Sequence, residues 1–447
     1  MRKYSILGAG LSGLSCSYHL GHENCTIYEE KSHAGGHIYS HLENGYMWDE
    51  GPHVSFTDNL YVRNLFEDGA DGKVLDFPVL VSNYYKGIWI PHPAQSNLFA
   101  VPIGIREKCL EDFLAARNSP TSNEAPKNYG EWLEKAFGKT FSKIFPTAYT
   151  RKYWTVEPEI LDTEWIGNRV FYPDAETVIS GSLQAPKNSS HYINTVRYPD
   201  SGGYFTFAGK LLENSEICFN HKVSRIDLVE RIIYFSNGQC SKYENLISTL
   251  PLPELVRLSS PPPNIMDAAN KLNCSSLLLV NITANHTAKK PYHWMYVYDE
   301  DKYSTRINVI ELLSPRNTPI GKTGVQVEVY ESGFKRFDLS HDEIAAKVSQ
   351  EVIDMGLVDS IETVHTKYIP YANVIFDHER IENQNLILSW LEKFGLKRES
   401  DDLNAMTNWA KDNKVKYGNI VLAGRFGQWK YFWTDDCVLR GKEIAGK

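Results

Sequence analysis

The residues best suited to chemistry at the start of this chain are a set of spaced glycines followed by an acid. Gly8, Gly10 and Gly13 form a Gly-x-Gly-x-x-Gly pattern, and Glu29 follows about twenty residues after the first of them. Glycines at this spacing allow a tight turn and let a pyrophosphate approach the N-terminus of the next helix. An acid at this distance is suited to bind a ribose hydroxyl. The pattern therefore predicts a dinucleotide-binding site.

The elements that must position this turn are a strand, a helix and a second strand. Residues 3–7 predict a short buried strand, residues 14–20 have helical spacing, and residues 25–28 predict the next strand, which ends at Glu29. This βαβ order favours a dinucleotide-binding turn over a glycine-rich turn that binds no ligand.

A second pair of glycines follows Glu29 and refines this prediction. The spacing of Gly35-Gly36 resembles that of the FAD-binding amine-oxidase-like superfamily more than that of NAD dehydrogenases. The resemblance implies FAD as the cofactor. The residues expected to bind it in this region are Gly8, Gly10, Leu11, Ser12, Gly13, Glu29, Gly35, Gly36 and His37.

The patterns farther along the chain predict two insertions into a discontinuous domain. Residues 111–117 and 129–137 have helical spacing, residues 277–282 and 324–330 predict strands, and residues 420–424 predict a strand that returns to the first domain. We expect an α/β fold: a discontinuous Rossmann-like FAD-binding domain with an inserted helical domain and an inserted antiparallel β-sheet domain. The expected segments are 1–97 (FAD-binding), 98–197 (helical, substrate-binding), 198–255 (FAD-binding), 256–404 (β-sheet-rich, substrate-binding) and 405–447 (FAD-binding).

Composition narrows the class of protein. The chain has 447 residues, of which 42% are hydrophobic and 23% charged, as expected of a globular protein with two or three domains. A formal charge of −8 argues against general nucleic-acid binding, and it requires local arginines for any anionic substrate. The seven cysteines include no Cys-x-x-Cys pair, which favours reduced thiols in a cytoplasmic protein over a metal site. We expect no membrane span, and the oligomeric state is left open, a homo-oligomer included.

Six further groups of residues occur in an order that resembles one family. They are Gly51-Pro52-His53-Val54; Pro91 to Asn97; Tyr153-Trp154 with residues 165–170; His293 to Tyr296 with Arg306; Tyr371; and Gly424 to Tyr431. Together they resemble the UDP-galactopyranose mutase family, and more its eukaryotic-type branch than the short bacterial one. The similarity covers nearly the whole chain as separate segments.

The resemblance implies a reaction without net redox change. Pyranose and furanose forms of a nucleotide sugar, most simply a UDP-galactose-like sugar, are interconverted while N5 of reduced FAD acts as the nucleophile on the anomeric carbon. NADPH or NADH is implied as the reductant. No side-chain general base is required, which agrees with the lack of an obvious Ser/His/Asp set or paired carboxylates.

The resemblance also assigns roles to single residues. His53 and Arg425 are expected to face the flavin, and Val223 and Asp435 to add cofactor contacts. Because a diphosphate carries about two charges, guanidinium forks and phenol hydroxyls suit it. The residues expected at the substrate are His92, Gln95, Trp154, Arg169, Tyr296, Arg306, Tyr371 and Tyr431.

Departures from the family pattern leave the natural sugar open. His92 stands where the family has tyrosine, and Asp435-Asp436 stand where it has Asn-Gln. We expect at least one of these carboxylates to point away from the diphosphate or to bind a ribityl hydroxyl. An imidazole titrates near neutrality, so His92→Tyr is expected to flatten the rate profile between about pH 6 and 7.5.

Two other functions are compatible with the same glycine pattern. An oxidoreductase of the amine-oxidase or protoporphyrinogen-oxidase kind would share the FAD domain but would have no use for the Arg169, Arg306 and tyrosine set. A catalytically idle FAD-binding scaffold would bind a flavin that reacts with nothing once reduced.

Overall fold

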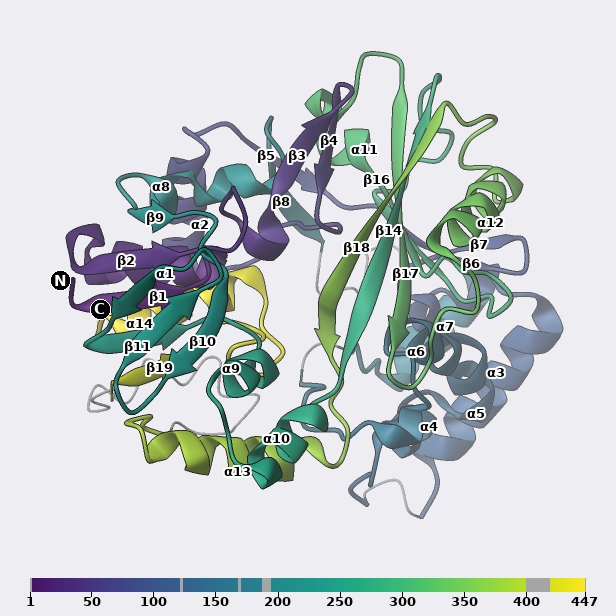
Figure 1. Ribbon diagram of the computed structural model, residues 1–447. Coiled ribbons are helices and arrows are strands. Elements are labelled where there is room, and N and C mark those ends of the chain that lie inside the picture. Colours follow the sequence, from purple (N-terminus) through teal and green to yellow (C-terminus); the bar gives the residue numbers. More distant parts are fainter. Residues whose placement is uncertain (1, 121–123, 168–169, 187–193, 399–418, 447) are drawn as a thin grey trace.

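The computed structural model describes residues 2–120, 124–167, 170–186, 194–398 and 419–446. Figure 1 shows two sheets side by side, with a group of helices below the larger one. The smaller of the two is parallel and the larger is mostly antiparallel. The α/β class and the discontinuous dinucleotide-binding domain expected from the sequence are confirmed.

The parallel sheet contains both ends of the chain. Its strand order is β19-β13-β1-β2-β9, and every neighbouring pair is parallel. Helix α1 packs against α14, where a Cβ added to Gly441 would lie 2.3 Å from Ser15 Oγ. The strands predicted at residues 3–7, 25–28 and 420–424 are confirmed. The bounds are β1 Tyr4–Leu7, α1 Leu11–Leu20, β2 Cys25–Tyr28, β9 Ile217–Cys218, β13 Asn245–Ser248, β19 Ile420–Leu422 and α14 Thr434–Ile444.

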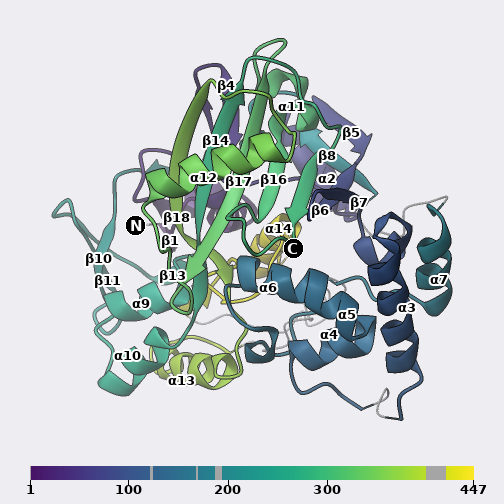
Figure 2. The ribbon, with the colours of Figure 1, turned by 90° about the vertical axis from the view of Figure 1, so that its right-hand side faces the viewer.

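The larger sheet has seven strands in the order β18-β14-β17-β16-β15-β6-β7. All neighbours are antiparallel except β15 and β6, which are parallel. Strands β6 and β7 fall in the expected first FAD-binding segment, yet they join this sheet because β6 pairs with β15. Helix α12 lies across one face (Figure 2). The bounds are β6 Val81–Tyr85, β7 Ile88–Pro91, β14 Cys274–Ala284, β15 Trp294–Val297, β16 Arg306–Val309, β17 Thr323–Ser332, β18 Thr363–Val374 and α12 His341–Asp354.

The helices below this sheet come from the predicted insertion. Asn128 and Asp174 begin α4 and α7 as N-caps, accepting hydrogen bonds from the backbone of Glu131 and Thr177. A π-helical turn, Lys143–Thr147, joins α5 to α6. The helical spacing at residues 111–117 and 129–137 is confirmed. The bounds are α3 Ile103–Arg117, α4 Tyr129–Phe137, α5 Lys139–Ser142, α6 Ala148–Tyr153 and α7 Ala175–Leu183.

Smaller elements connect these parts. A three-stranded sheet is formed by β10 Val223–Asp227, β11 Ile232–Phe235 and β12 Cys240–Lys242, and two-stranded ribbons by β3 Ser40–Glu43 with β4 Tyr46–Asp49 and by β5 Val74–Pro78 with β8 Thr195–Pro199. The remaining α-helices are α2 Leu60–Gly69, α8 Gly209–Leu212, α9 Leu252–Leu258, α10 Pro263–Asn270, α11 Ile310–Leu313 and α13 Arg380–Glu392. Within the described ranges, no helix combines the length and apolar character needed to cross a membrane.

Candidate cofactor and substrate site

A cavity of about 1030 Å³ lies where these parts meet. The glycine turn and β10 line one end of it. Strands β15, β16 and β17 of the seven-stranded sheet line another part, and α6 with its preceding π turn also lines the cavity. The cavity is therefore continuous from the predicted dinucleotide site to the predicted substrate residues.

The glycine turn is shaped by contacts that leave no room for larger side chains. Gly8 has φ +98°, and a Cβ there would lie 2.4 Å from Thr249 Oγ1. A Cβ on Gly13 would lie 2.0 Å from the carbonyl oxygen of Gly8, so α1 begins directly against the end of β1. Gly10 caps α1 without a side chain, and Gly10, Leu11 and Ser12 line the cavity. The first turn of α1 thus presents backbone to a ligand, as a pyrophosphate requires.

Glu29 is held in place at the end of β2. Its Oε2 accepts a hydrogen bond from Ala9 N at 2.8 Å, and its Oε1 accepts one from Lys31 N at 2.9 Å. The side chain is buried and lines the cavity. A carboxylate has about four lone-pair positions, so Glu29 retains acceptors for a ribose hydroxyl. Val223 lines the same end.

His53 is neutral in its surroundings. Its Nδ1 donates to Gly51 O at 2.8 Å, which leaves Nε2 as an acceptor. Burial, with lesser contributions from His37 and the cations Arg306 and Arg425, lowers the pKa of His53 to about 4. His37 donates through Nε2 to Tyr371 O at 2.6 Å.

Arg425 is joined to the helical insertion through a shared amide. Its Nη2 donates to Asn373 Oδ1 at 2.7 Å, and the hydroxyl of Tyr153 donates to the same oxygen at 2.9 Å. The buried Nε of Arg425 has no hydrogen-bond partner within the described part of the chain. The open turn of α1, the acid at Glu29 and the side chain of Arg425 all line the cavity, and together they give a set of groups that fits FAD.

The anion-binding candidates lie on adjacent strands. Tyr296 and Arg306 are directly opposite each other on β15 and β16, and both line the cavity. Arg306 forms a two-point ion pair with Glu328 of β17, with Nε–Oε2 at 2.5 Å and Nη2–Oε1 at 2.8 Å. A guanidinium has five N–H donors, so three remain for a ligand.

Aromatic rings surround this end of the cavity. The His92 ring lies 5.0 Å from that of Tyr296, and Tyr149 meets Tyr296 edge-on at 5.3 Å. Trp154 and Tyr431 lie 6.0 Å apart, and the Arg425 guanidinium lies 4.8 Å from the Tyr431 ring. Rings with polar tips suit a ligand that carries both hydroxyls and charge.

Lys152 ties the helical insertion to the sheet. Its buried Nζ donates to three backbone carbonyls, those of Val297 at 3.1 Å, Asp299 at 2.7 Å and Ser304 at 2.7 Å. The carboxylate of Glu351 accepts from the backbone of Ser304 on the other side of the same loop. Because Lys152 is on α6, this attachment positions the tyrosines of that helix.

Most of the predicted site residues meet in the cavity. Those that line it are Gly8, Gly10, Leu11, Ser12, Glu29, Gly35, Gly36, His37, His53, His92, Gln95, Trp154, Val223, Tyr296, Arg306, Tyr371, Arg425 and Tyr431. Gly13 acts instead through the packing of α1. Asp435 is not among the lining residues, so its cofactor contact stays a prediction. Asp436, the third residue of α14, accepts from the backbone N of the N-cap residue Trp433 at 2.7 Å. Arg169 lies outside the described residues.

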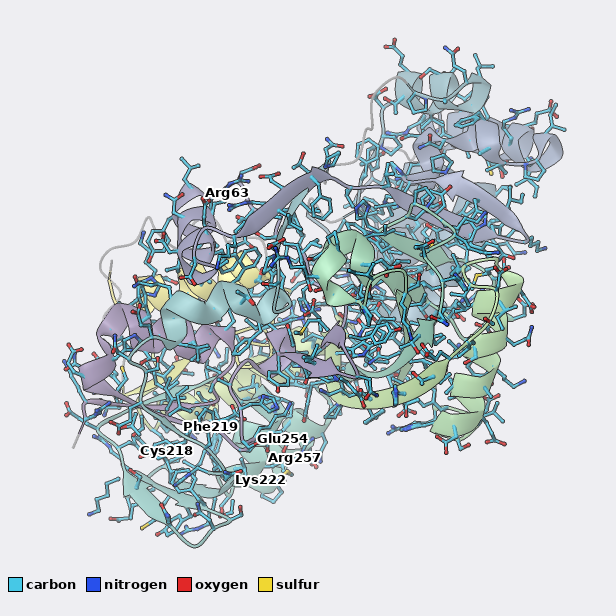
Figure 3. The ribbon with its side chains drawn as sticks, turned by 90° about the horizontal axis from the view of Figure 1, so that it is seen from above. Arg63, Cys218, Phe219, Lys222, Glu254 and Arg257 are labelled. Carbon is cyan, nitrogen blue, oxygen red and sulfur yellow. The ribbon has the colours of Figure 1, made fainter. Side chains whose placement is uncertain are left out.

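Tyr371 reaches the cavity but directs its hydroxyl elsewhere. That hydroxyl donates to Glu254 Oε1 at 2.5 Å, and Arg257 Nη1 binds the same oxygen at 2.6 Å. Figure 3 labels Glu254 and Arg257, which are three residues apart on α9 and joined by this hydrogen bond. To contact a diphosphate, the Tyr371 hydroxyl would have to give up its hydrogen bond to Glu254 on α9. The expected contact of Tyr371 with the diphosphate stays a prediction.

Several site residues were not found by sequence reasoning. Glu328, Asn373 and Tyr149 all line the cavity and contact predicted residues. Glu328 alternates with valines in a predicted strand, a pattern that ordinarily indicates a solvent-facing position. In β17 both faces are buried. A buried acid ordinarily needs a partner, so an acid on such a strand was the signal that could have identified Glu328 as a site residue.

Comparison with known proteins agrees with the geometry. A family model described as an NAD(P)-binding Rossmann-like domain matches residues 6–68. The dTDP-fucopyranose mutase of Escherichia coli is 26% identical over 182 residues, covering 36% of this chain and 43% of that protein. Protoporphyrinogen oxidase 2 of Arabidopsis thaliana is 30% identical over 265 residues, covering 55% and 52%. The chain spans about half the length of the curated relatives it matches.

The Rossmann-like domain and its insertions define a fold class to which solved structures of a sugar mutase and of a putative protoporphyrinogen oxidase belong. Within that class the structure is similar over its whole length to reduced UDP-galactopyranose mutase, with a TM-score of 0.88, 25% identity and coverage of 100% of this chain and 95% of that one. A putative protoporphyrinogen oxidase from Exiguobacterium gives a TM-score of 0.72 at 15% identity, covering 99% and 98%. The resemblance to UDP-galactopyranose mutase inferred from the sequence is confirmed.

Proposed function

We propose that this chain is a flavin-dependent mutase that interconverts the pyranose and furanose forms of a nucleotide sugar, with a UDP-galactose-like sugar as the substrate class. The observation that carries the proposal is the continuous cavity, which joins the open N-terminus of α1 to the Arg306–Tyr296 pair. The full-length similarity to UDP-galactopyranose mutase supports it. Reduction by NADPH or NADH belongs to the same proposal.

The residues of the chain have separable tasks in this reaction. Arg306, held by Glu328, binds the departing diphosphate and keeps it close enough to return. The hydroxyl of Tyr296, whose residue lies opposite Arg306 on β15, adds a neutral donor. Trp154 and Tyr431 cover the sugar and exclude water. FAD, when bound and reduced, supplies the nucleophile at N5 and recovers its electrons within each turnover.

Neutral His53 suits a reaction of this kind. Because its pKa is lowered, no positive charge lies at this position near neutral pH. Its Nε2 accepts rather than donates, so it can orient a ligand N–H or O–H without giving up a proton.

The alternative is an FAD-dependent oxidoreductase of the protoporphyrinogen-oxidase kind. The match to the Arabidopsis protein favours it, but the charged and hydroxylated lining at Arg306 does not suit an apolar substrate. The two functions differ in how much product each reduced flavin can form before it must be reduced again.

The test is anaerobic turnover after a single reduction. Protein reduced once with dithionite is given UDP-galactopyranose or dTDP-fucopyranose, and product per flavin is measured with the mass of the sugar product. The proposal expects many turnovers, an unchanged mass and no activity with oxidised flavin. Product that stops at one equivalent, or isomerisation by the oxidised protein, would contradict it.

A further inference from the structure

Nine residues other than glycine have a positive φ in the part of the chain that the structure describes, and two of them are buried. The buried two are Thr155, with φ +63° and 3% exposure, and Trp429, with φ +54° and 0% exposure. Left-handed backbone is unfavourable for β-branched and bulky side chains, so it persists only where the surrounding structure imposes it, most often at functional sites. The exposed ones are Asn44, Asp71, Lys86, Asn214, Asn220, Arg231 and Ser260.

Thr155 closes the C-terminal end of α6. Its backbone N donates to Thr150 O at 3.1 Å, and it follows the C-cap Trp154 at the position where a helix usually has glycine. Its hydroxyl forms a hydrogen bond with Ser332 Oγ at 2.7 Å, at the end of β17. The turn is therefore tied to the seven-stranded sheet, and it fixes the direction in which the chain leaves α6.

Trp429 has a similar place in the C-terminal segment. The N–H of the next residue, Lys430, donates to Arg425 O at 2.9 Å. This bond closes a turn that has Arg425 at its start and is followed directly by Tyr431. Both Arg425 and Tyr431 line the cavity.

The residues beside the two left-handed positions meet at two points. Tyr153 and Arg425 both donate to Asn373 Oδ1, at 2.9 and 2.7 Å. The rings of Trp154 and Tyr431 lie 6.0 Å apart. All of these residues line the cavity. The two buried left-handed residues therefore flank the same part of the cavity wall.

We propose that Thr155 is a positioning residue that places the Trp154 ring against Tyr431. Glycine would satisfy the backbone at residue 155 without strain, but it would lack the hydroxyl that binds Ser332 and would leave the chain free to depart from α6 in other directions. Threonine restricts that exit at a cost in stability. The inference rests on the proposed function only for its activity assay, because the ring contact can be measured without a substrate.

The test compares Thr155→Gly with a matched change at Ser260. Ser260 has φ +50° and follows the C-cap of α9 as Thr155 follows that of α6, but it is exposed and does not line the cavity. Both substitutions place glycine at a left-handed position that carries a hydroxyl. Only Thr155→Gly should affect the contact between Trp154 and Tyr431.

The contact is measured by fluorine NMR of the FAD-loaded protein labelled with 5-fluorotryptophan. The Trp154 resonance is assigned by its loss in Trp154→Phe. Tyr431→Leu should shift that resonance in the wild type and equally in Ser260→Gly, because the two rings are neighbours. In Thr155→Gly the same Tyr431→Leu change should shift it by less than half as much, since the effects of residues that no longer touch become independent.

Two further variants complete the experiment. Thr155→Ser keeps the hydroxyl and should restore the full shift. Ser332→Ala leaves Thr155 in place and removes only its partner, so it should reduce the shift even if Thr155→Gly fails to fold. A role in stability alone would lower the Tm of Thr155→Gly and leave the Tyr431-dependent shift as in the wild type, which would overturn the inference.

The activity assay tests the consequence for catalysis. With UDP-galactopyranose and reduced flavin, Thr155→Gly should lower kcat on the order of tenfold, because misplaced groups lose rate steeply. The affinity for UDP should not change, because UDP lacks the sugar that Trp154 and Tyr431 cover. Wild-type kcat in Thr155→Gly would overturn the inference. Wild-type protein that converts no nucleotide sugar would defeat the proposed function, and the fluorine experiment would still decide the inference.

Discussion

Arg306 and Glu328 lie side by side on β16 and β17 and form a two-point ion pair inside the cavity. The side chain of Glu328 is 2% exposed and that of Arg306 is 24% exposed. The pair is neutral as a whole, yet it fixes the guanidinium plane and leaves three N–H groups of this cavity-lining residue outside the ion pair. Glu328 therefore orients the guanidinium of Arg306, which we expect to donate hydrogen bonds to an anionic ligand. Its carboxylate also offsets the positive charge of Arg306.

Removing Arg306 should affect both ligand binding and stability. Arg306→Ala is expected to weaken UDP binding by about 1.5–3 kcal/mol, the range for hydrogen bonds to charged groups. It should also lower the free energy of unfolding, because Glu328 is left buried without its partner. Calorimetric titration with UDP and urea unfolding measure the two effects, and the FAD content should hardly change.

A double change separates these two roles. In Arg306→Leu/Glu328→Leu no buried charge lacks a partner, so most of the lost stability should return while UDP affinity stays weak. UDP affinity that returns together with stability would show that Arg306 acts only through the fold.

The cofactor is expected to be FAD bound without a covalent link. The glycine turn and Glu29 suit a dinucleotide, and no tethering motif is evident in the sequence. Acid precipitation of the purified protein should release yellow FAD into the supernatant at about one per chain. Colour that remains in the pellet, or FMN in the supernatant, would contradict the assignment of residues 6 to 36.

Lys152 is expected to be needed for the attachment of the helical insertion. Lys152→Met removes the donor from three buried carbonyls, so the free energy of unfolding should fall by about 2–3 kcal/mol. Lys143→Met, at an exposed lysine just before α6, is the matched control and should change stability little. Equal effects of the two substitutions on urea unfolding would rule out the anchoring role.

The lowered pKa of His53 predicts a pH-dependent stability. Its pKa is about 4 in the folded protein, below the ordinary value near 6.5. Between these values the unfolded chain takes up a proton that the folded chain does not. The free energy of unfolding should therefore fall as the pH falls from about 6.5 toward 4.

His53→Asn should reduce this slope, measured by urea unfolding at a series of pH values. The exposed His378→Asn serves as the control for loss of a histidine. A slope that is the same in wild type and His53→Asn would show that His53 is not the group responsible.

The amino-acid sequence by itself determined the local parts of this protein. The strand, glycine turn, helix and acid at residues 4–29 could be predicted because they are contiguous, and because only glycine satisfies the positive φ at Gly8 and the contact at Gly13. The helical spacing of the insertion and the long buried strands were predictable for the same reason: backbone periodicity is written in neighbouring residues.

Only the tertiary structure decided which distant groups meet. Strand register placed Glu328 against Arg306 and Trp294 opposite Asn308, and pairing with β15 moved β6 and β7 from the expected first domain into the seven-stranded sheet. The hydroxyl of Tyr371 turned to Glu254 because α9 lies within reach. These contacts depend on the packing of segments far apart in the chain, which no local pattern of residues encodes.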